Sequence, residues 1–474
     1  MSRRQSRTPA SLESMGEVAM SIARAVAPVL PLDVFGADLL VPLVTGERVR
    51  QVNLDCAASP PCLRAAHEAV VSALPWYASV NRGAGFASGV STRLLDAARA
   101  AIGAFAGARP DDEVILTRNT TEALNLLAAA LPEGATAVVF ASEHHANLLP
   151  WRRGRHVQLA PPRRRDEVVS CAERALRGLP AGARLLAVTG ASNVTGEIWP
   201  IAELCAMAHR HGARVVVDAA QLAPHRRIDL RAIGADFVAF SAHKLHAPFG
   251  SGALVGRRDW LDAARPWLAG GGATRRVLPD RVEWSDSPAR HEAGTPNLLG
   301  AVAFAAACRA LAEAGWDAIA AHESALLEHL LRGLRTLPGV EVLSLWGPRA
   351  ERIGVVTFTV AGRDPALLAA ALSAEHGIGV RDGAFCAHPL VAALTDPARP
   401  QPALRASFGA ASTLQDIDRL LSALDAILSR GLRWRYVRHA GRFVPDPDPR
   451  PAPDLAAGLP AEPGQAPCLS RLSA

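Results

Sequence analysis

Residues 213–244 have the sequence ARVVVDAAQLAPHRRIDLRAIGADFVAFSAHK, and the fold can be inferred outward from this stretch. It contains two short apolar runs, Arg214–Val217 and Asp236–Phe240, which lack the polar–apolar alternation of a half-exposed strand. Strands buried on both faces have this pattern, and they occur in parallel sheets covered by helices. Polar residues follow each run directly, so we expect them at the carboxyl ends of two strands.

The same alternation of short apolar runs and longer helical segments extends over residues 112–256. We predict strands at Glu113–Leu116, Ala135–Phe140, Arg184–Val188, Arg214–Val217, Asp236–Phe240 and Gly252–Val255. Between most of them lie helix-like segments such as Thr121–Leu131 and Ile201–His211. This order predicts one large α/β domain, with a mainly parallel sheet between helices.

The sequence after residue 297 predicts a smaller α+β domain. Its expected helices are Leu298–Ala314, Trp316–Thr336, Pro365–His376 and Leu414–Leu432, and its expected strands are Ile353–Val360 and Ile378–Arg381. From residue 444 onward Pro, Asp, Ala and Gly dominate without apolar periodicity, which is typical of disorder. We therefore divide the chain into an N-terminal arm (1–50) with a helix at Ser11–Val29, a large domain (51–311), a small domain (312–443) and a disordered Pro-rich tail (444–474).

The basic residues are distributed very unevenly between the two types. Of 51 lysine and arginine residues in the 474-residue chain, Lys244 is the only lysine. A GC-rich coding sequence drifts from lysine to arginine, and on a surface the exchange often costs little. Arginine cannot replace lysine where an amine must lose its proton or form a Schiff base. Lys244 is therefore a candidate chemical group.

Composition excludes several other classes of protein. Hydrophobic residues make up 49% and charged residues 20% of the chain, as in a globular protein. No apolar run is long enough to span a bilayer, and Glu13 and Glu17 interrupt the stretch after Arg3-Arg4 that an export signal would need. The seven cysteines show no zinc spacing, and the 51 basic residues are interspersed with 45 acidic ones. We expect a cytoplasmic protein that binds neither metal, nucleic acid nor membrane.

Unusual polar residues follow five of the predicted strands. In chain order they are Asn119-Thr120-Thr121-Glu122, Glu143-His144-His145, Ser192-Asn193, Asp218 with Gln221, and Ser241 with His243 and Lys244. Any one group could be loop polarity or a helix cap. Because the carboxyl ends of parallel strands meet at one edge of a sheet, the five groups together predict one composite site.

These residue types match the requirements of pyridoxal 5'-phosphate (PLP). Lys244 would form the Schiff base, and Asp218 would keep the ring nitrogen protonated. Gln221 could hydrogen-bond the phenolic oxygen, and His144 could stack on the ring. Thr120 and Thr121 lie at a helix start that favours a phosphate, to which Ser241 and His243 could also donate.

Several motifs resemble the class V aminotransferase superfamily of fold-type I PLP enzymes. They are DAAQ (Asp218–Gln221), SAHK (Ser241–Lys244), EHHAN (Glu143–Asn147) and GTPN (Gly294–Asn297). EHHANLLPW (Glu143–Trp151), SNVTG (Ser192–Gly196) and RDGAFCAHPL (Arg381–Leu390) look like group II cysteine desulfurases and selenocysteine lyases. The resemblance covers residues 50 to 430 in the expected order.

The resemblance implies a homodimer with its site at the subunit interface, in which Thr295 reaches the phosphate of the neighbouring subunit. It implies that Arg405, assisted by Asn193 and Arg381, binds the substrate carboxylate. It also implies that Cys386 attacks the sulfur of L-cysteine, which yields L-alanine and a persulfide for an acceptor protein.

The cysteine loop departs from the family pattern. Ala384 and Phe385 stand where the family usually has two histidines, His388 replaces a glutamine, and Asn81 replaces an early histidine. Two alternatives therefore stay open. The chain could be a class V aminotransferase, lyase or epimerase for another amino acid, with Cys386 not catalytic, or an inert PLP-binding protein.

Overall fold

The computed structural model describes residues 30–81, 83–396 and 401–451. Its centre is a seven-stranded sheet in which β10 runs antiparallel to both neighbours, β4 and β9, while the pairs from β9 to β6 are parallel. In sheet order the strands are β4 (Asp112–Thr117), β10 (Gly252–Arg257), β9 (Phe237–Ser241), β8 (Ala213–Asp218), β7 (Arg184–Thr189), β5 (Thr136–Phe140) and β6 (Arg155–Leu159).

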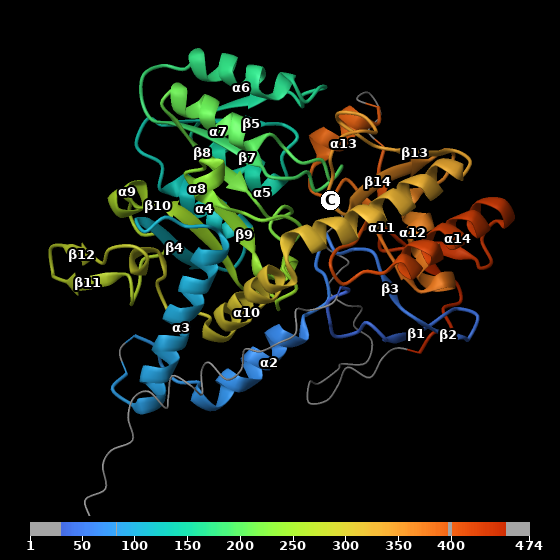
Figure 1. The fold of residues 1–474 in the computed structure, drawn as a ribbon, viewed down its shortest axis with the longest axis horizontal. Coiled ribbons are helices and arrows are strands. Elements are labelled where there is room, and N and C mark those ends of the chain that lie inside the picture. Colours follow the sequence, from blue (N-terminus) through green and yellow to red (C-terminus); the bar gives the residue numbers. More distant parts are fainter. Residues whose placement is uncertain (1–29, 82, 397–400, 452–474) are drawn as a thin grey trace, which may run out of the picture.

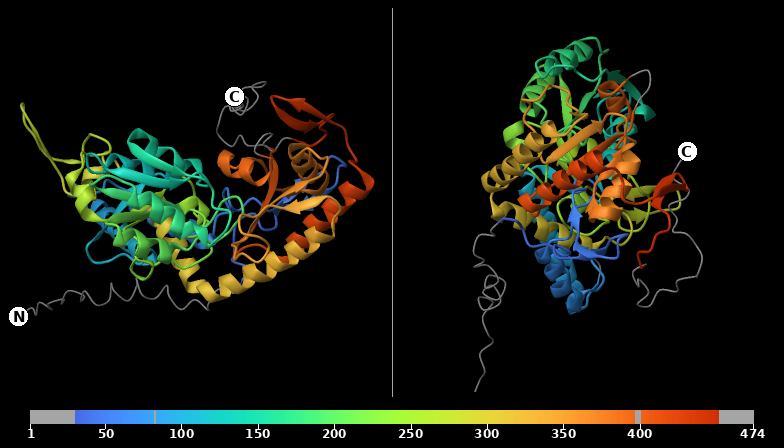
Figure 2. Two further views of the ribbon diagram at one scale, coloured as in Figure 1. Left: turned by 90° about the horizontal axis from the view of Figure 1, so that it is seen from above. Right: turned by 90° about the vertical axis from the view of Figure 1, so that its right-hand side faces the viewer.

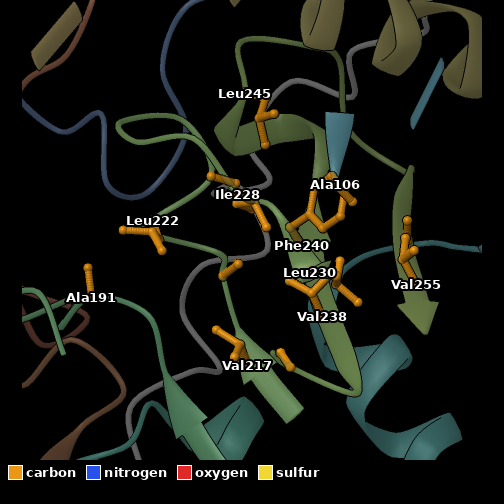
Figure 3. Packing of buried hydrophobic residues seen from close by; sticks show 14 of the residues in the cluster. Ala106, Ala191, Val217, Leu222, Ile228, Leu230, Val238, Phe240, Leu245 and Val255 are labelled. Carbon is orange, nitrogen blue, oxygen red and sulfur yellow. The ribbon is translucent and has the colours of Figure 1, made fainter. Parts of the chain in front are cut away.

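Successive residues of these strands are buried in two different clusters, one on each face of the sheet. On β8 and β9, Val217 and Val238 belong to one cluster, whereas Val216 and Ala239 belong to the other. Figure 3 shows Val217, Val238 and Phe240 pointing into the first cluster. Burial on both faces removes the polar alternation from the sequence, as expected for a parallel sheet.

Helices cover both faces of the sheet and make a three-layer domain (Figure 1). The first cluster takes side chains from α3 (Phe86–Phe105), α6 (Glu167–Arg177), α7 (Ile201–Arg210) and α10 (Leu298–Ala314). The second takes them from α4 (Thr120–Ala129), α5 (His145–Leu148), η2 (Pro150–Arg153) and α9 (Arg258–Ala263). The predicted α/β architecture is confirmed.

A second core belongs to the small domain. Its sheet has the order β13-β14-β17-β16, and all its pairs are antiparallel. The strands are β13 (Val340–Val342), β14 (Val355–Val360), β17 (Ala403–Ser407) and β16 (Arg381–Gly383). Leucine-rich faces of α11 (Trp316–Thr336), α12 (Pro365–His376) and α14 (Leu414–Arg430) pack in this core. The short helix α13 (His388–Leu394) packs in a separate cluster with Phe385.

Two segments connect the domains. Helix α11 begins in the core of the large domain at Trp316 and Ile319 and ends in that of the small domain at Leu330 and Leu334. In the left view of Figure 2, α10 and α11 run along the lower side from one domain to the other. The early strand β3 (Val52–Asn53) pairs in parallel with β15 (Ile378–Gly379) of the small domain. The chain therefore passes through the small domain before it forms the large one.

Further short elements complete the described chain. They are β1 (Leu40–Pro42) and β2 (Arg48–Arg50), α2 (Arg64–Ala73), η1 (Leu74–Trp76), α8 (Leu230–Ile233), η3 (Ala242–Lys244), η4 (Ala289–His291), and two hairpins, β11 (Thr274–Val277) with β12 (Val282–Trp284) and β18 (Tyr436–His439) with β19 (Arg442–Pro445). The expected start of the tail, residue 444, falls within β19, and the expected helix at Ser11–Val29 and the tail from 452 to 474 lie outside the described residues. In the described part of the chain no single helix is long and apolar enough to cross a membrane; α10 and α11 pass that test only as a pair, bent by 80°.

All six strands predicted for the large domain are present. Among the strands that were not predicted are β6 of the large domain and β17 of the small domain. Strand β6 lies at the sheet edge, and its sequence RHVQL is half polar because alternate side chains reach solvent. Strand β17 is fully buried although its sequence, ALRAS, carries an arginine and a serine. Both sequences have a weak strand propensity, and these segments become strands because they pair with neighbouring strands in the folded chain.

Candidate active site

A cavity of about 270 Å³ lies where the carboxyl ends of the parallel strands meet the small domain. Its lining includes residues from each of the five groups of strand-end residues expected to form one site. The predicted residues in the lining are Thr120, Thr121, His144, Asn193, Asp218, Gln221, Ser241, His243, Lys244, Arg381, Cys386 and Arg405. Thr295 does not line this cavity; it is exposed in the turn before α10.

Lys244 and Asp218 form the charged centre of the cavity. Lys244 ends the 3-10 turn that follows β9, and Asp218 is the last residue of the neighbouring β8. Burial lowers the pKa of Lys244 from 10.5 to about 8, against the opposing effect of Asp218. Burial also raises the pKa of Asp218, which accepts a hydrogen bond from the Ala220 N–H at 3.0 Å. Near neutral pH the Lys244 amine is therefore partly unprotonated.

His144 follows the end of β5, and its imidazole is held in the neutral form. Burial and the nearby Lys244 lower the pKa of its imidazole to about 3. Its Nδ1 accepts the Ala146 N–H at 3.0 Å, which leaves the ring proton on Nε2. The preceding Glu143 is fully buried and accepts the Thr189 N–H at 3.0 Å and an Asn147 amide N–H at 2.8 Å. These bonds attach the histidine turn to β7.

The start of helix α4 closes one end of the cavity. Asn119 caps the helix by accepting the Glu122 N–H at 2.9 Å. The Thr120 N–H donates to Ser241 Oγ at 2.7 Å, and the two side-chain oxygens are 2.6 Å apart. Thr121 also faces the cavity. A helix N-terminus with hydroxyl groups beside it is suited to an anion such as phosphate.

Two further predicted residues are anchored by the segment that follows β3. His243 Nδ1 lies 2.7 Å from Ser59 Oγ, and burial and Lys244 lower the pKa of this histidine to about 4. Gln221 donates one amide N–H to the Ala57 carbonyl oxygen at 2.8 Å. Residues 55–59 therefore act as a support that fixes the side chains of His243 and Gln221.

Arg405 enters the cavity from β17 of the small domain. Its side chain is only 4% exposed, and burial lowers its pKa to about 10. It donates to the Asn193 carbonyl oxygen at 3.0 Å and to Asp55 at 3.2 Å, and its guanidinium lies 5.0 Å from the ring centroid of Phe385. Arg381, expected to assist in substrate binding, also lines the cavity and pairs with Asp55 at 2.8 Å.

Cys386 lies in a tight turn between β16 and α13 and is exposed to the cavity. Phe385 and Cys386 both have left-handed backbone conformations, with φ values of 53° and 54°, which cost energy in residues other than glycine. Two hydrogen bonds from the large domain maintain the turn: Asn193 Nδ2 donates to the Phe385 oxygen at 2.7 Å, and the His145 N–H donates to the Cys386 oxygen at 2.8 Å. The turn is therefore anchored at two successive carbonyl groups.

Sequence reasoning missed two residues of the site, Asp55 and Ser59. Asp55 lies two residues after β3 (Val52–Asn53), close to a strand end as the recognised residues are, so the strand-end rule could have identified it. Ser59 gives no comparable signal, because its role depends on His243, 184 positions later. In the described part of the chain no group of three or more His, Cys, Asp or Glu residues is arranged to hold a metal ion.

Comparison with known proteins agrees with this geometry. The model of the class-V aminotransferase family matches residues 52–420, and the chain belongs to this family. Among its relatives is a cysteine desulfurase of Klebsiella pneumoniae, 37% identical over 362 residues, which are 74% of this chain and 86% of that protein. A probable cysteine desulfurase of Mycolicibacterium paratuberculosis is 35% identical over 364 residues, which are 74% of this chain and 52% of that protein.

Solved structures support the same assignment. The apo cysteine desulfurase of Thermococcus onnurineus has a TM-score of 0.73 at 32% identity, covering 80% of this chain and 95% of that one. A cysteine desulfurase of Escherichia coli, in an S-sulfonic acid form, has a TM-score of 0.71 at 32% identity, with the same coverage. The predicted superfamily and fold are confirmed.

Proposed function

We propose that this chain is a PLP-dependent cysteine desulfurase, which converts L-cysteine to L-alanine and leaves the sulfur as a persulfide on Cys386. The observation that carries the proposal is that Lys244, Arg405 and Cys386 line one cavity. They supply an amine, a carboxylate-binding group and a nucleophilic sulfur. The relatives named as cysteine desulfurases support the same conclusion.

The residues of the cavity fit PLP. Among the described residues, the buried carboxyl group of Asp218 accepts one hydrogen bond, from the Ala220 N–H, and it suits the protonated nitrogen of a pyridine ring. At the other end, the start of α4, Ser241 and the neutral His243 form a cradle for a phosphate. When bound, PLP supplies an aldehyde for Lys244 and a ring that withdraws electrons from the substrate carbon. Lys244, Asp218, Gln221, Ser241, His243, Thr120 and Thr121 would hold it, with His144 over the ring.

The other groups position the substrate and move protons. Arg405 presents a planar guanidinium that can bind the α-carboxylate in a bidentate manner, next to Asn193, whose backbone carbonyl oxygen accepts a hydrogen bond from it. With a pKa of about 8, Lys244 can accept and return a proton near neutral pH. His144 is neutral with a proton on Nε2, so it can donate a hydrogen bond without adding a second cation.

Cys386 carries the sulfur chemistry. Its thiol and L-cysteine would give L-alanine and a Cys386 persulfide, so atoms balance without an added oxidant. Cys386 lines the same cavity as Lys244, Arg381 and Arg405, which places it near both the amine and the carboxylate-binding group. Because the turn is anchored, the substrate sulfur must come to Cys386, and an acceptor protein must then collect the sulfur at the cavity mouth.

The proposal includes a homodimer in which Thr295 of each chain reaches the phosphate site of the other. Two observations support it: Thr295 is exposed, and Phe249, which is 76% exposed, contacts His243 at a ring distance of 5.9 Å. A partner chain would cover this apolar side chain next to the phosphate cradle. The cytoplasmic location expected from the sequence stays a prediction.

The test measures sulfide and L-alanine released from L-cysteine by the PLP-loaded protein, with a thiol as sulfur acceptor. We expect Cys386→Ala to lose both products while it keeps the visible absorption of the bound cofactor. Cys171→Ala, which removes a partly buried thiol of α6 outside the cavity, is the matched control and should keep full activity. Full sulfide release by Cys386→Ala would refute the role of this cysteine.

One observation favours a second candidate, a class V enzyme that acts on another amino acid without sulfur transfer. The residue before Cys386 is an apolar Phe385 packed against Arg405, where the family usually has histidine. A screen of the common amino acids in the same assay separates the two functions. Turnover of another amino acid, with no sulfide from L-cysteine, would favour the second.

A further inference from the structure

Strands β16 and β17 bring two arginines into the cavity side by side. Arg381 and Arg405 are direct partners in the antiparallel register, so both side chains leave the same face of the small sheet. Both line the cavity, as does Cys386. Like charges directly opposite one another repel, so the pair requires a counter-charge.

Asp55 supplies this counter-charge from a fixed position. Its backbone forms a parallel bridge with Ser407 at the end of β17. On either side of Asp55, the Ser407 N–H donates to the Leu54 oxygen at 2.7 Å and the Cys56 N–H donates to the Ser407 oxygen at 3.2 Å. The carboxylate is therefore held between the two guanidinium groups by the sheet itself.

Asp55 is shared unequally between the two arginines. Arg381 makes three contacts with it, from Nε at 3.2 and 3.0 Å and from Nη2 at 2.8 Å, whereas Arg405 makes one, from Nη2 at 3.2 Å. The Nε of Arg405 is buried and has no hydrogen-bond partner among the described residues. Arg405 thus keeps donors for a carboxylate, while the Nε edge of Arg381 is already occupied.

We propose that Asp55 is a specificity residue, which restricts the pocket to amino acids with one carboxylate by keeping Arg381 occupied. Without this ion pair, Arg381 would be free beside Cys386, where the side chain of the bound amino acid must lie for sulfur transfer. A second guanidinium there would bind an acidic side chain. The inference rests on the proposed function only through the role of Arg405 in binding the α-carboxylate.

The test compares L-alanine and L-aspartate, which differ by one carboxylate on the side chain. Each is titrated into the PLP-loaded protein, and its dissociation constant is obtained from the visible absorption of the cofactor. In Asp55→Asn we expect the constant for L-aspartate to fall about tenfold relative to that for L-alanine, the effect of one charge-assisted hydrogen bond. The double variant Asp55→Asn/Arg381→Leu should lose this gain.

Asp259→Asn is the matched control. Asp259 also accepts two hydrogen bonds from one arginine, Arg214, at 2.6 and 2.5 Å, but it lies outside the cavity. It should leave the ratio of the two constants unchanged.

Two results with the variants would overturn the inference: an equal change for both amino acids in Asp55→Asn, as expected of a purely structural counter-ion, or a gain for L-aspartate that persists without Arg381. Failure of the wild-type protein to bind either amino acid would also overturn it. Because these titrations require no sulfur transfer, a protein that binds both amino acids but releases no sulfide would refute the proposed function and leave the Asp55 test intact.

Discussion

The lone lysine permits a direct measurement of the electrostatics of the site. Burial lowers the pKa of Lys244 to about 8, whereas an exposed lysine titrates near 10.5. At pH 8 about half of the Lys244 amine should therefore be unprotonated, against roughly 0.3% at the ordinary value. Two neighbouring charged groups act in opposite directions, because Asp218 raises this pKa and Arg405 lowers it.

Two substitutions should shift the titration with opposite signs. Asp218→Asn removes a group that stabilises the ammonium form, so the pKa should fall by about one unit. Arg405→Gln removes a neighbouring cation, so the pKa should rise by a similar amount. Glu203→Gln, an exposed change on α7 outside the cavity, is the control and should leave the titration where it is.

The assay is carbon-13 NMR of the cofactor-free protein, grown with lysine labelled at Cε. Because the chain contains a single lysine, one side-chain resonance reports the titration without assignment. A midpoint at or above pH 10 would refute the conclusion that burial deprotonates Lys244. Shifts of the same sign in the two cavity variants would refute the account of its neighbours.

Two further predictions concern the support of the site. Burial raises the pKa of Glu143 from 4.5 to about 8, so the folded protein keeps a proton that the unfolded chain loses, and stability falls as pH rises from about 4.5 to 8. Glu143→Gln lacks this titration, so its Tm should rise relative to that of the wild type as pH increases across this range. A Tm difference that stays constant with pH would contradict the raised pKa. Gly196 has φ +74°, and an added Cβ would lie 2.5 Å from the Val355 oxygen, so Gly196→Ala should destabilise the protein by about 2 kcal/mol or more in urea unfolding. Gly212→Ala, at φ +65° with open space around it, should cost only about 1 kcal/mol, and equal costs would contradict the steric argument.

Much of the site could be predicted because the central sheet of the large domain is mainly parallel. The carboxyl ends of parallel strands converge at one edge of the sheet, so the polar residues that follow the strands are sufficient to locate the site. Asp218, Asn193 and Lys244 follow this rule, and all three line the cavity. Arg405 did not follow it, because it lies within a buried strand, and only the family motif identified it.

The anchoring of the cysteine turn could not be predicted. Residues 383–389 indicate a loop bounded by Gly and Pro, which suits a reaching cysteine. In the structure the turn is tight and bonded to Asn193 and His145 of the other domain. These hydrogen bonds join residues that are far apart in the chain, Asn193 with Phe385 and His145 with Cys386, so no local sequence pattern indicates them.

By itself the sequence determined the α/β class, the strand ends that carry chemistry, and the importance of the one lysine. These properties are local: they depend on residue type and on the order of apolar and polar segments. The tertiary structure alone decided how Arg381 and Arg405 share the carboxylate of Asp55, with three contacts from Arg381 and one from Arg405. Asp55 is 326 positions from Arg381 and 350 from Arg405, and only the pairing of β3 with the small domain brings its charge between them. An electrostatic preference depends on distances in space, and the folded chain sets those distances.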